Sequence, residues 1–181
     1  MKSTVGSFVR DLVEILVAAF VIAIVIRTFI VEVTKVPTAS MVPTIEVGDR
    51  LLTDKIWFRV SGLHDGEVIV FQPPFPTSDP FVKRIIGLPG DRIAVREGVV
   101  YRNGQPLVEP YIAQAPNYTR LEVTVPAGKL LVLGDNRNQS EDSHLWAGDT
   151  IRSWGFADIS KVKGRVIWRL WPLSQFGPVP R

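Results

Sequence analysis

Residues 15–26 read ILVAAFVIAIVI, twelve apolar residues without interruption, and this stretch decides how the rest of the chain is organised. The apolar character extends over residues 12–33 if the three charged residues within that range are tolerated. At about 1.5 Å of rise per residue, such a helix would be about 33 Å long, and the hydrocarbon core of a bilayer is about 30 Å thick. We therefore expect a transmembrane helix over residues 12–33.

The residues on either side of this helix indicate whether it is kept and how it is oriented. Lys2 and Arg10 precede an apolar run of signal-peptide length, so a cleavable signal peptide is an alternative. No small-x-small cleavage site is found before Lys35, which favours retention as a single-pass anchor. Positive charge before the helix orients residues 1–11 toward the cytoplasm. Residues 34–181 then form an extracytoplasmic domain held at the cell membrane.

The composition fits a folded domain attached to this anchor. Of the 181 residues, 46% are hydrophobic and 22% are charged, which is enough apolar material for a core. The net charge of +3 comes from dispersed lysines and arginines, so nucleic acid is not an expected partner. The chain has no cysteine, which excludes disulfides, thiolate metal sites and a cysteine nucleophile. Any nucleophile must therefore be an oxygen or an amine.

Beyond the helix, the pattern is typical of an antiparallel β domain. Apolar and polar residues alternate over residues 121–125, and LLVL follows at residues 130–133, which together predict a hairpin. Glu-Gly at 97–98 and Asn-Gly at 103–104 mark tight turns between short strands. Four prolines within residues 71–80 predict a loop. We expect a mainly β protein, with one N-terminal transmembrane helix followed by an antiparallel β-sheet domain.

Few residues in this domain are suited to catalysis by a histidine. The chain contains only two histidines, His64 and His144. Asp142 and His144 lie on the same face of an extended segment, so a Ser40, His144, Asp142 triad is one possible arrangement. A Ser-His-Asp hydrolase therefore remains an alternative at this point.

A lysine can replace histidine as the general base if its amine is neutral at the working pH. Lys83 lies in FVKRIIGLPGD, where the alternating pattern surrounds it with apolar residues. An ordinary lysine has a pKa of about 10.4, so less than about 1% of it is neutral at pH 8. Burial among apolar residues lowers that pKa and turns the amine into a usable base. A lysine whose ammonium reaches water is the competing interpretation.

Three stretches together resemble one family, the bacterial type I signal peptidases, also called leader peptidases. SMVPT at residues 40–44 resembles the family's nucleophile motif, and KRIIGLPGD at residues 83–91 resembles its general-base motif. GDNRNQSEDS at residues 134–143 resembles a third signature block. The order of the motifs and the preceding apolar segment also match, and the resemblance covers roughly residues 27–172.

The resemblance implies a membrane-anchored serine endopeptidase with a Ser/Lys dyad, which removes signal peptides from exported preproteins. Ser40 would be the nucleophile and Lys83 the general base. The Ser40 N–H and the Thr38 hydroxyl would hold the oxyanion, where Thr38 stands at a position that is commonly serine. Ser140 would orient the lysine amine. No cofactor or metal is expected, because no ligand cluster is visible.

The resemblance also assigns supporting residues and a substrate pocket. Polar support near the site would come from Arg84, Asp135 and Asp142. The pocket for small substrate side chains would involve Val36, Met41 and Val82. The expected partners are signal-peptide-bearing preproteins and the lipid bilayer, and the sequence does not predict an oligomeric state.

Two departures from the family pattern affect only the surroundings of the site. His144 stands where many members have arginine, so its contact with Asp142 would depend on pH or be a neutral hydrogen bond. Residues 147–154 resemble an insertion relative to the usual spacing. A membrane-tethered β module that binds partners without catalysis is a further alternative, and it would predict damage to Ser40 or Lys83, both of which are intact.

Overall fold

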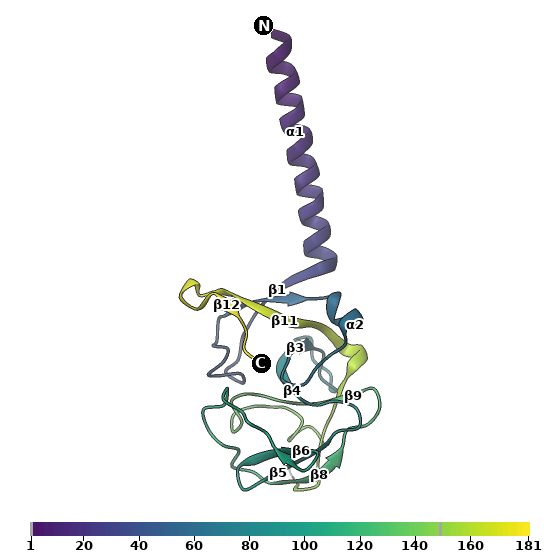
Figure 1. Cartoon of the computed structure of the whole chain (residues 1–181), viewed down its shortest axis with the longest axis vertical. Coiled ribbons are helices and arrows are strands. Elements are labelled where there is room, and N and C mark those ends of the chain that lie inside the picture. Colours follow the sequence, from purple (N-terminus) through teal and green to yellow (C-terminus); the bar gives the residue numbers. More distant parts are fainter. Residues whose placement is uncertain (1, 149) are drawn as a thin grey trace.

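The structure, a computed structural model, describes residues 2–148 and 150–181. Met1, within the expected cytoplasmic segment, and Asp149, within the expected insertion, lie outside the described residues. A long helix stands apart from a β domain, and the chain enters that domain at its near end (Figure 1).

The apolar segment forms the helix α1 (Lys2–Val25), continued by a π-helical turn, η1 (Ile26–Ile30). By its length and composition, the helical stretch of residues 6–30 could cross a membrane, and none of it is buried against the domain. The prediction of a helix that continues to residue 33 is wrong at its C-terminal end. Residues 31–33 belong to strand β1 (Val31–Lys35), because their apolar and polar side chains alternate and their backbone pairs with β2 (Arg50–Asp54).

The rest of the chain consists of short strands and turns. The remaining elements are α2 (Trp57–Ser61), β3 (Val68–Phe71), β4 (Phe81–Gly87), β5 (Arg92–Arg96), β6 (Val99–Arg102), β7 (Gln105–Pro106), β8 (Arg120–Thr124), β9 (Lys129–Leu133), β10 (Ala157–Asp158), η2 (Ile159–Lys161), β11 (Val162–Trp171), η3 (Leu173–Gln175) and β12 (Gly177–Pro178).

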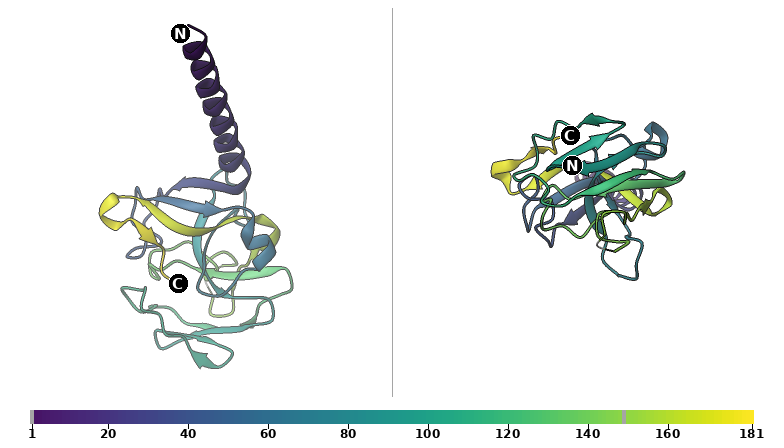
Figure 2. Two further views of the ribbon diagram at one scale, coloured as in Figure 1. Left: turned by 45° about the horizontal axis from the view of Figure 1, so that its top comes forward. Right: turned by 90° about the horizontal axis from the view of Figure 1, so that it is seen from below.

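These strands form two antiparallel sheets, so the predicted fold class is confirmed. The large sheet has the order β1-β2-β11-β3-β4-β9-β10, with β12 paired to β11. The small sheet has the order β7-β6-β5-β8 and lies at the end of the domain away from α1 (Figures 1 and 2). The large sheet therefore lies between the helix and the small sheet.

The predicted tight turns are confirmed, and the predicted hairpin is not. Glu97 and Gly98 join β5 to β6 and Asn103 and Gly104 join β6 to β7, all four with positive φ, as two-residue hairpin turns require. By contrast, β8 pairs with β5 in the small sheet, and β9 pairs with β4 and β10 in the large sheet. The stretch PAGK therefore joins the two sheets, because each strand finds its partner elsewhere in the chain.

The interior strand β4 contacts all three hydrophobic clusters of the core. Val82 packs in one cluster, Ile85 in a second and Ile86 in a third. Both faces of β4 are therefore covered, so a lysine on this strand is held away from water.

Candidate active site

Ser40 lies in the loop between β1 and β2, and the third signature block fixes the position of this loop. The Asn136 N–H donates to the Ser40 carbonyl at 3.1 Å, and Asn136 Nδ2 donates to the Ala39 carbonyl at 3.1 Å. At the base of the loop, the Val36 N–H donates to the Asp49 carbonyl at 3.0 Å. These bonds leave the Ser40 side chain free to point toward β4.

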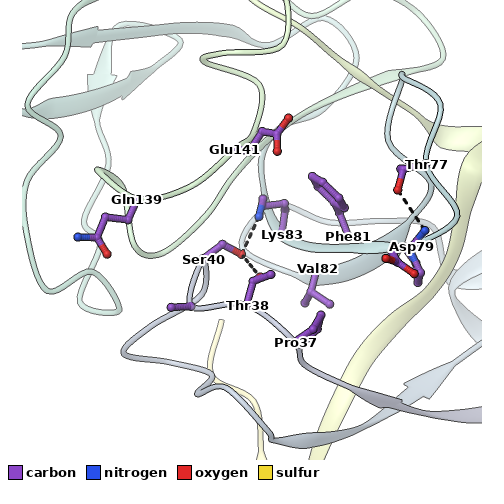
Figure 3. Close-up of a pocket in the computed structure, with 12 residues that line it drawn as sticks. Pro37, Thr38, Ser40, Thr77, Asp79, Phe81, Val82, Lys83, Gln139 and Glu141 are labelled. Carbon is purple, nitrogen blue, oxygen red and sulfur yellow. Dashed lines mark hydrogen bonds between the residues drawn. The ribbon is translucent and has the colours of Figure 1, made fainter.

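The Ser40 hydroxyl meets the Lys83 amine, as Figure 3 shows. Lys83 Nζ lies 2.7 Å from Ser40 Oγ, a hydrogen-bond distance between residues that are far apart in the sequence. Ser40 is 8% exposed and Lys83 is 3% exposed, so the pair is largely shielded from water. A neutral amine at this distance can accept the hydroxyl proton.

The surroundings of Lys83 favour that neutral form. Burial lowers the pKa of Lys83 from 10.5 to about 8. The negative charges of Asp142, Glu141 and Asp135 act in the other direction and raise this pKa, but their effect is smaller than that of burial. The Phe81 ring lies 5.3 Å from Nζ and covers one side of the amine. The prediction that apolar burial surrounds Lys83 is confirmed.

Thr38 lies beside the same hydroxyl. Thr38 Oγ1 is 3.4 Å from Ser40 Oγ, at the limit of a hydrogen bond, and its side chain faces the same cleft (Figure 3). No hydrogen-bond acceptor is described for the Ser40 N–H among the residues that the structure covers. Two donors of different kinds are thus available near the nucleophile.

A cleft of about 400 Å³ opens over Ser40 and Lys83. Its walls come from residues 37–40, from residues 77 and 79–83, and from Gln139 and Glu141 (Figure 3). Of the three residues expected in a substrate pocket, Val82 lines this cleft. Val36 and Met41 are fully buried and pack with Val82 in the core cluster behind it.

Sequence reasoning did not identify several residues of this cleft. Glu141 and Gln139 both lie within the third signature block, next to Ser140. Thr77 and Asp79 lie in the proline-rich loop that precedes β4, the strand that carries Lys83. Their closeness to recognised motif residues was the available signal.

A buried ion pair lies next to the site and joins two of the segments that form it. Arg84 donates from Nε to Asp135 Oδ1 at 2.8 Å and from Nη2 to Asp135 Oδ2 at 2.7 Å, and both side chains are fully buried. The Arg84 guanidinium also stacks 3.9 Å from the centre of the Tyr111 ring. Since Arg84 follows Lys83 on β4 and Asp135 precedes Asn136, this two-fold contact joins the strand of the lysine to the block that holds Ser40.

Asp142 connects His144 to the same block. Its carboxylate accepts hydrogen bonds from the Gly134 N–H at 2.8 Å and from the His144 N–H at 3.1 Å, and it lies 2.6 Å from His144 Nδ1. The His144 ring stacks on Tyr118 at 4.1 Å. The hydrogen-bonding partners described for Ser40 Oγ are Lys83 and Thr38, so the structure does not assemble the Ser40, His144, Asp142 triad.

Ser140 lies near Ser40 without a hydrogen bond to the Lys83 amine. It is 4% exposed, and within the described part of the chain its hydroxyl has no hydrogen-bond partner. A methyl group on Gly134 would collide with both the Ser140 hydroxyl and the Ser40 carbonyl oxygen. The absence of a side chain at Gly134 therefore allows these two serines to approach each other. No cluster of three or more His, Asp or Glu side chains that could hold a metal ion occurs in residues 2–148 and 150–181.

Comparison with known proteins gives consistent matches. A family model described as signal peptidase, peptidase S26, matches residues 9–171. The chain is 38% identical over 177 residues to the probable signal peptidase I-1 of Synechocystis sp., covering 94% of this chain and 86% of the relative. It is 42% identical over 170 residues to the signal peptidase I of Leptolyngbya laminosa, covering 88% of this chain and 80% of the relative.

A solved structure is also similar. The crystal structure of a signal peptidase I from Enterococcus faecalis V583 matches with a TM-score of 0.45 and 31% identity, covering 56% of this chain and 94% of the other.

Proposed function

The chain belongs to the peptidase S26 family of signal peptidases, which are serine endopeptidases, and we propose that it cleaves signal peptides with Ser40 as nucleophile and Lys83 as general base. The observation that carries this proposal is the 2.7 Å between Lys83 Nζ and Ser40 Oγ in a shielded cleft. With a pKa of about 8, the lysine is neutral in about half of the molecules at pH 8 and can accept the hydroxyl proton.

The reaction proceeds in two halves. In the first, Ser40 Oγ bonds to the scissile carbonyl carbon as its proton passes to Lys83 Nζ, and the resulting ammonium returns a proton to the leaving amine as the C–N bond breaks. This half leaves an ester between Ser40 and the signal peptide. In the second half, Lys83 takes a proton from water, the hydroxide attacks the ester, and Ser40 recovers its proton as the signal peptide leaves with a new carboxylate.

The developing oxyanion has two candidate donors, the Ser40 N–H and the Thr38 hydroxyl. A donor aimed at the charge that develops in the transition state is worth about 10²–10³ in rate. Thr38 Oγ1 lies close enough to Ser40 Oγ to reach the oxygen of a carbonyl attacked there. A threonine supplies the same O–H as the serine that is common at this position.

The remaining residues near the site have supporting roles in this proposal. The ion pair of Arg84 and Asp135 joins β4 to the signature block at residues 134–143, which holds the Ser40 loop. Within that block, the Asp142 carboxylate accepts a hydrogen bond from the Gly134 N–H. Ser140 orients the amine when the cleft is occupied, since its hydroxyl is buried nearby and has no hydrogen-bond partner among the described residues. A neutral amine has a single lone pair, so its direction decides whether it faces the nucleophile.

Substrates bind as extended segments along the cleft. Main-chain hydrogen bonds would align the preprotein as an added strand, and small side chains one and three positions before the cut would enter shallow apolar pockets. Val82 forms part of the cleft wall, with Val36 and Met41 in the core behind it. Larger side chains would have to displace this packed core, which accounts for a preference for small ones.

We also propose that α1 anchors the enzyme, with residues 34–181 on the extracytoplasmic face of the cell membrane and residues before the span in the cytoplasm. The support is the apolar span at residues 6–30, preceded by Lys2. Because Ser40 follows soon after β1, the nucleophile would lie near the bilayer, where the cleavage point of a membrane-inserted signal peptide emerges. Protease protection of the N-terminus in sealed vesicles, with digestion of the β domain from outside, would test this orientation.

The mechanism is tested by cleavage of a labelled preprotein by the detergent-solubilised full chain. We expect Lys83→Ala to lose at least about 10²-fold in kcat/KM, the range of a general base, and His144→Ala to keep cutting. Circular dichroism confirms folding of each variant. If Lys83→Ala cuts and His144→Ala does not, the base is misassigned. Failure of the folded wild type to cut any preprotein would favour a binding module without catalysis.

A further inference from the structure

A basic hollow lies beside the point at which the chain leaves α1. It has a volume of about 510 Å³, and it shares no lining residue with the cleft over Ser40. The charged residues that line it are Glu32, Lys55, Arg59, Lys161 and Lys163. Four cations and one anion therefore face one site.

The hollow is tied directly to the last turn of the helical segment. Lys55 donates from its backbone N–H to the Ile30 carbonyl at 2.9 Å, and its Nζ donates to the Thr28 carbonyl at 2.8 Å. Figure 1 shows β1 at the foot of α1 and α2 beside it. If α1 spans the bilayer, the hollow lies at the level of the lipid headgroups.

Most of the positive charge in the hollow is available to a ligand. The contact between Lys55 and Glu32 is long, at 3.9 Å. Arg59 Nε donates to the Lys55 carbonyl at 3.3 Å, and the Arg59 guanidinium lies 5.1 Å from the centre of the Phe58 ring, so neither contact neutralises its charge. Lys161 and Lys163 are exposed, and no ion pair is described for either of them in the part of the chain that the structure covers. Lys161 ends η2 and Lys163 is the second residue of β11, and both line the same hollow.

Apolar side chains lie next to this charge. On and just before α2, Ile56 is 43% exposed, Trp57 is 63% exposed and Val60 is 74% exposed. Tryptophan is typical of the boundary between lipid and water, where its ring meets both environments. Basic and apolar groups side by side fit a ligand with a phosphate and an acyl chain better than they fit a free anion.

We propose that the basic hollow binds the phosphate of an anionic phospholipid headgroup, such as that of phosphatidylglycerol. Lysine and arginine bind phosphate through charge-assisted hydrogen bonds, and each basic residue near a membrane surface adds about fivefold to the affinity for anionic lipid. This inference rests on the anchoring by α1 proposed above. A bound headgroup would hold the β domain at a fixed height and tilt on the membrane.

The test uses the full chain reconstituted in phosphatidylcholine vesicles that contain a trace of spin-labelled lipid. The fraction of motionally restricted label gives the affinity for phosphatidylglycerol relative to phosphatidylcholine. Lys161→Gln with Lys163→Gln removes two charges from the hollow, and Arg92→Gln with Arg96→Gln removes two from the small sheet as the matched control. Preprotein cleavage in neutral detergent confirms that each variant is folded.

We expect wild type and the control to prefer phosphatidylglycerol, and we expect the variant of the hollow to lose about fivefold of that preference for each lysine removed. Equal preference in the two variants would overturn the proposal. Displacement of restricted phosphatidylglycerol by inorganic phosphate, but not by chloride at matched ionic strength, would overturn the lipid as the ligand. If wild type restricts label without preference, the headgroup site is wrong; if it restricts no label, the anchoring is wrong as well.

Discussion

The activity of this enzyme should depend on pH through a single group, the amine of Lys83. Burial lowers the pKa of Lys83 to about 8, so the neutral fraction is about 1% at pH 6, about 10% at pH 7 and about 90% at pH 9. We therefore expect kcat/KM to fall about tenfold per pH unit below the pKa and to level off above pH 9. A lysine with an ordinary pKa would instead give a rate that still rises tenfold per unit through pH 9.

The assay is the initial rate of cleavage of a labelled preprotein, at low substrate concentration, across pH 5.5 to 9.5 at constant ionic strength. Circular dichroism at each pH separates loss of activity from loss of fold. Since the charge of Glu141 raises the pKa of Lys83, Glu141→Gln should move the midpoint to lower pH. The matched control is Glu122→Gln, which removes a carboxylate that pairs with Arg92 in the small sheet and should leave the midpoint unchanged.

Two results would refute this reasoning. A profile that stays flat from pH 6 to 9 in a folded enzyme would mean that no group with the pKa of Lys83 controls the reaction. A midpoint that rises in Glu141→Gln would mean that the controlling group is not a cation beside this carboxylate.

Further predictions concern the residues around the dyad. Because burial lowers the pKa of Lys83, its charged ammonium destabilises the folded protein by roughly 3 kcal/mol below about pH 8. This destabilisation disappears as the pH rises from 8 to 10.5, where the lysine is neutral in the folded state. Lys83→Met should therefore raise the free energy of unfolding, measured in urea, at pH 7 and not at pH 10.5. Thr38→Val should lower kcat by about 10²–10³ with little change in KM, and Thr38→Ser should restore it; equal kcat in both would exclude the hydroxyl as a donor. Arg84→Met should leave Asp135 buried without its partner and lower the unfolding free energy by about 3–5 kcal/mol, measured by urea denaturation, and a change below about 1 kcal/mol would contradict the role of the pair. Gly134→Ala should lose both activity and thermal stability, because its methyl group would collide with the carbonyl of the nucleophile, and wild-type activity in this variant would show that the loop can move aside.

The parts of the fold that depend on local pattern were predictable from the sequence. The apolar run predicted a long helix, and the structure contains one that is long and apolar enough to cross a membrane. The two-residue turns at 97–98 and 103–104 predicted hairpins that the structure also contains. The end of the helix was not predicted, since VEV at residues 31–33 is apolar enough for a span and becomes a strand only through pairing with β2. The partner of β8 was not predicted either, because strand pairing depends on residues far away in the chain.

The candidate site shows the same division. Alternation along β4 predicted the burial of Lys83, and the contact with Ser40 joins two motifs that are distant in the sequence. Sequence position alone could not distinguish residues in the wall of the cleft from residues in the core behind it. Val82 and Met41 were both expected in the substrate pocket, but only Val82 lines the cleft. Nor could it show that Glu141 faces the cleft, since an exposed acid in a loop carries no local signal of its surroundings.

The most direct measurement of the central claim is mass spectrometry of the enzyme mixed with a preprotein and quenched in acid before the ester hydrolyses. Trypsin cleavage after Lys35 and Arg50 releases residues 36–50, which contain Ser40. We predict that this peptide carries, on Ser40 in wild type, the added mass of the C-terminal tryptic fragment of the signal peptide, and that no such peptide forms in Lys83→Ala. An adduct on any other residue, or an equal yield of the adduct in Lys83→Ala, would contradict the account.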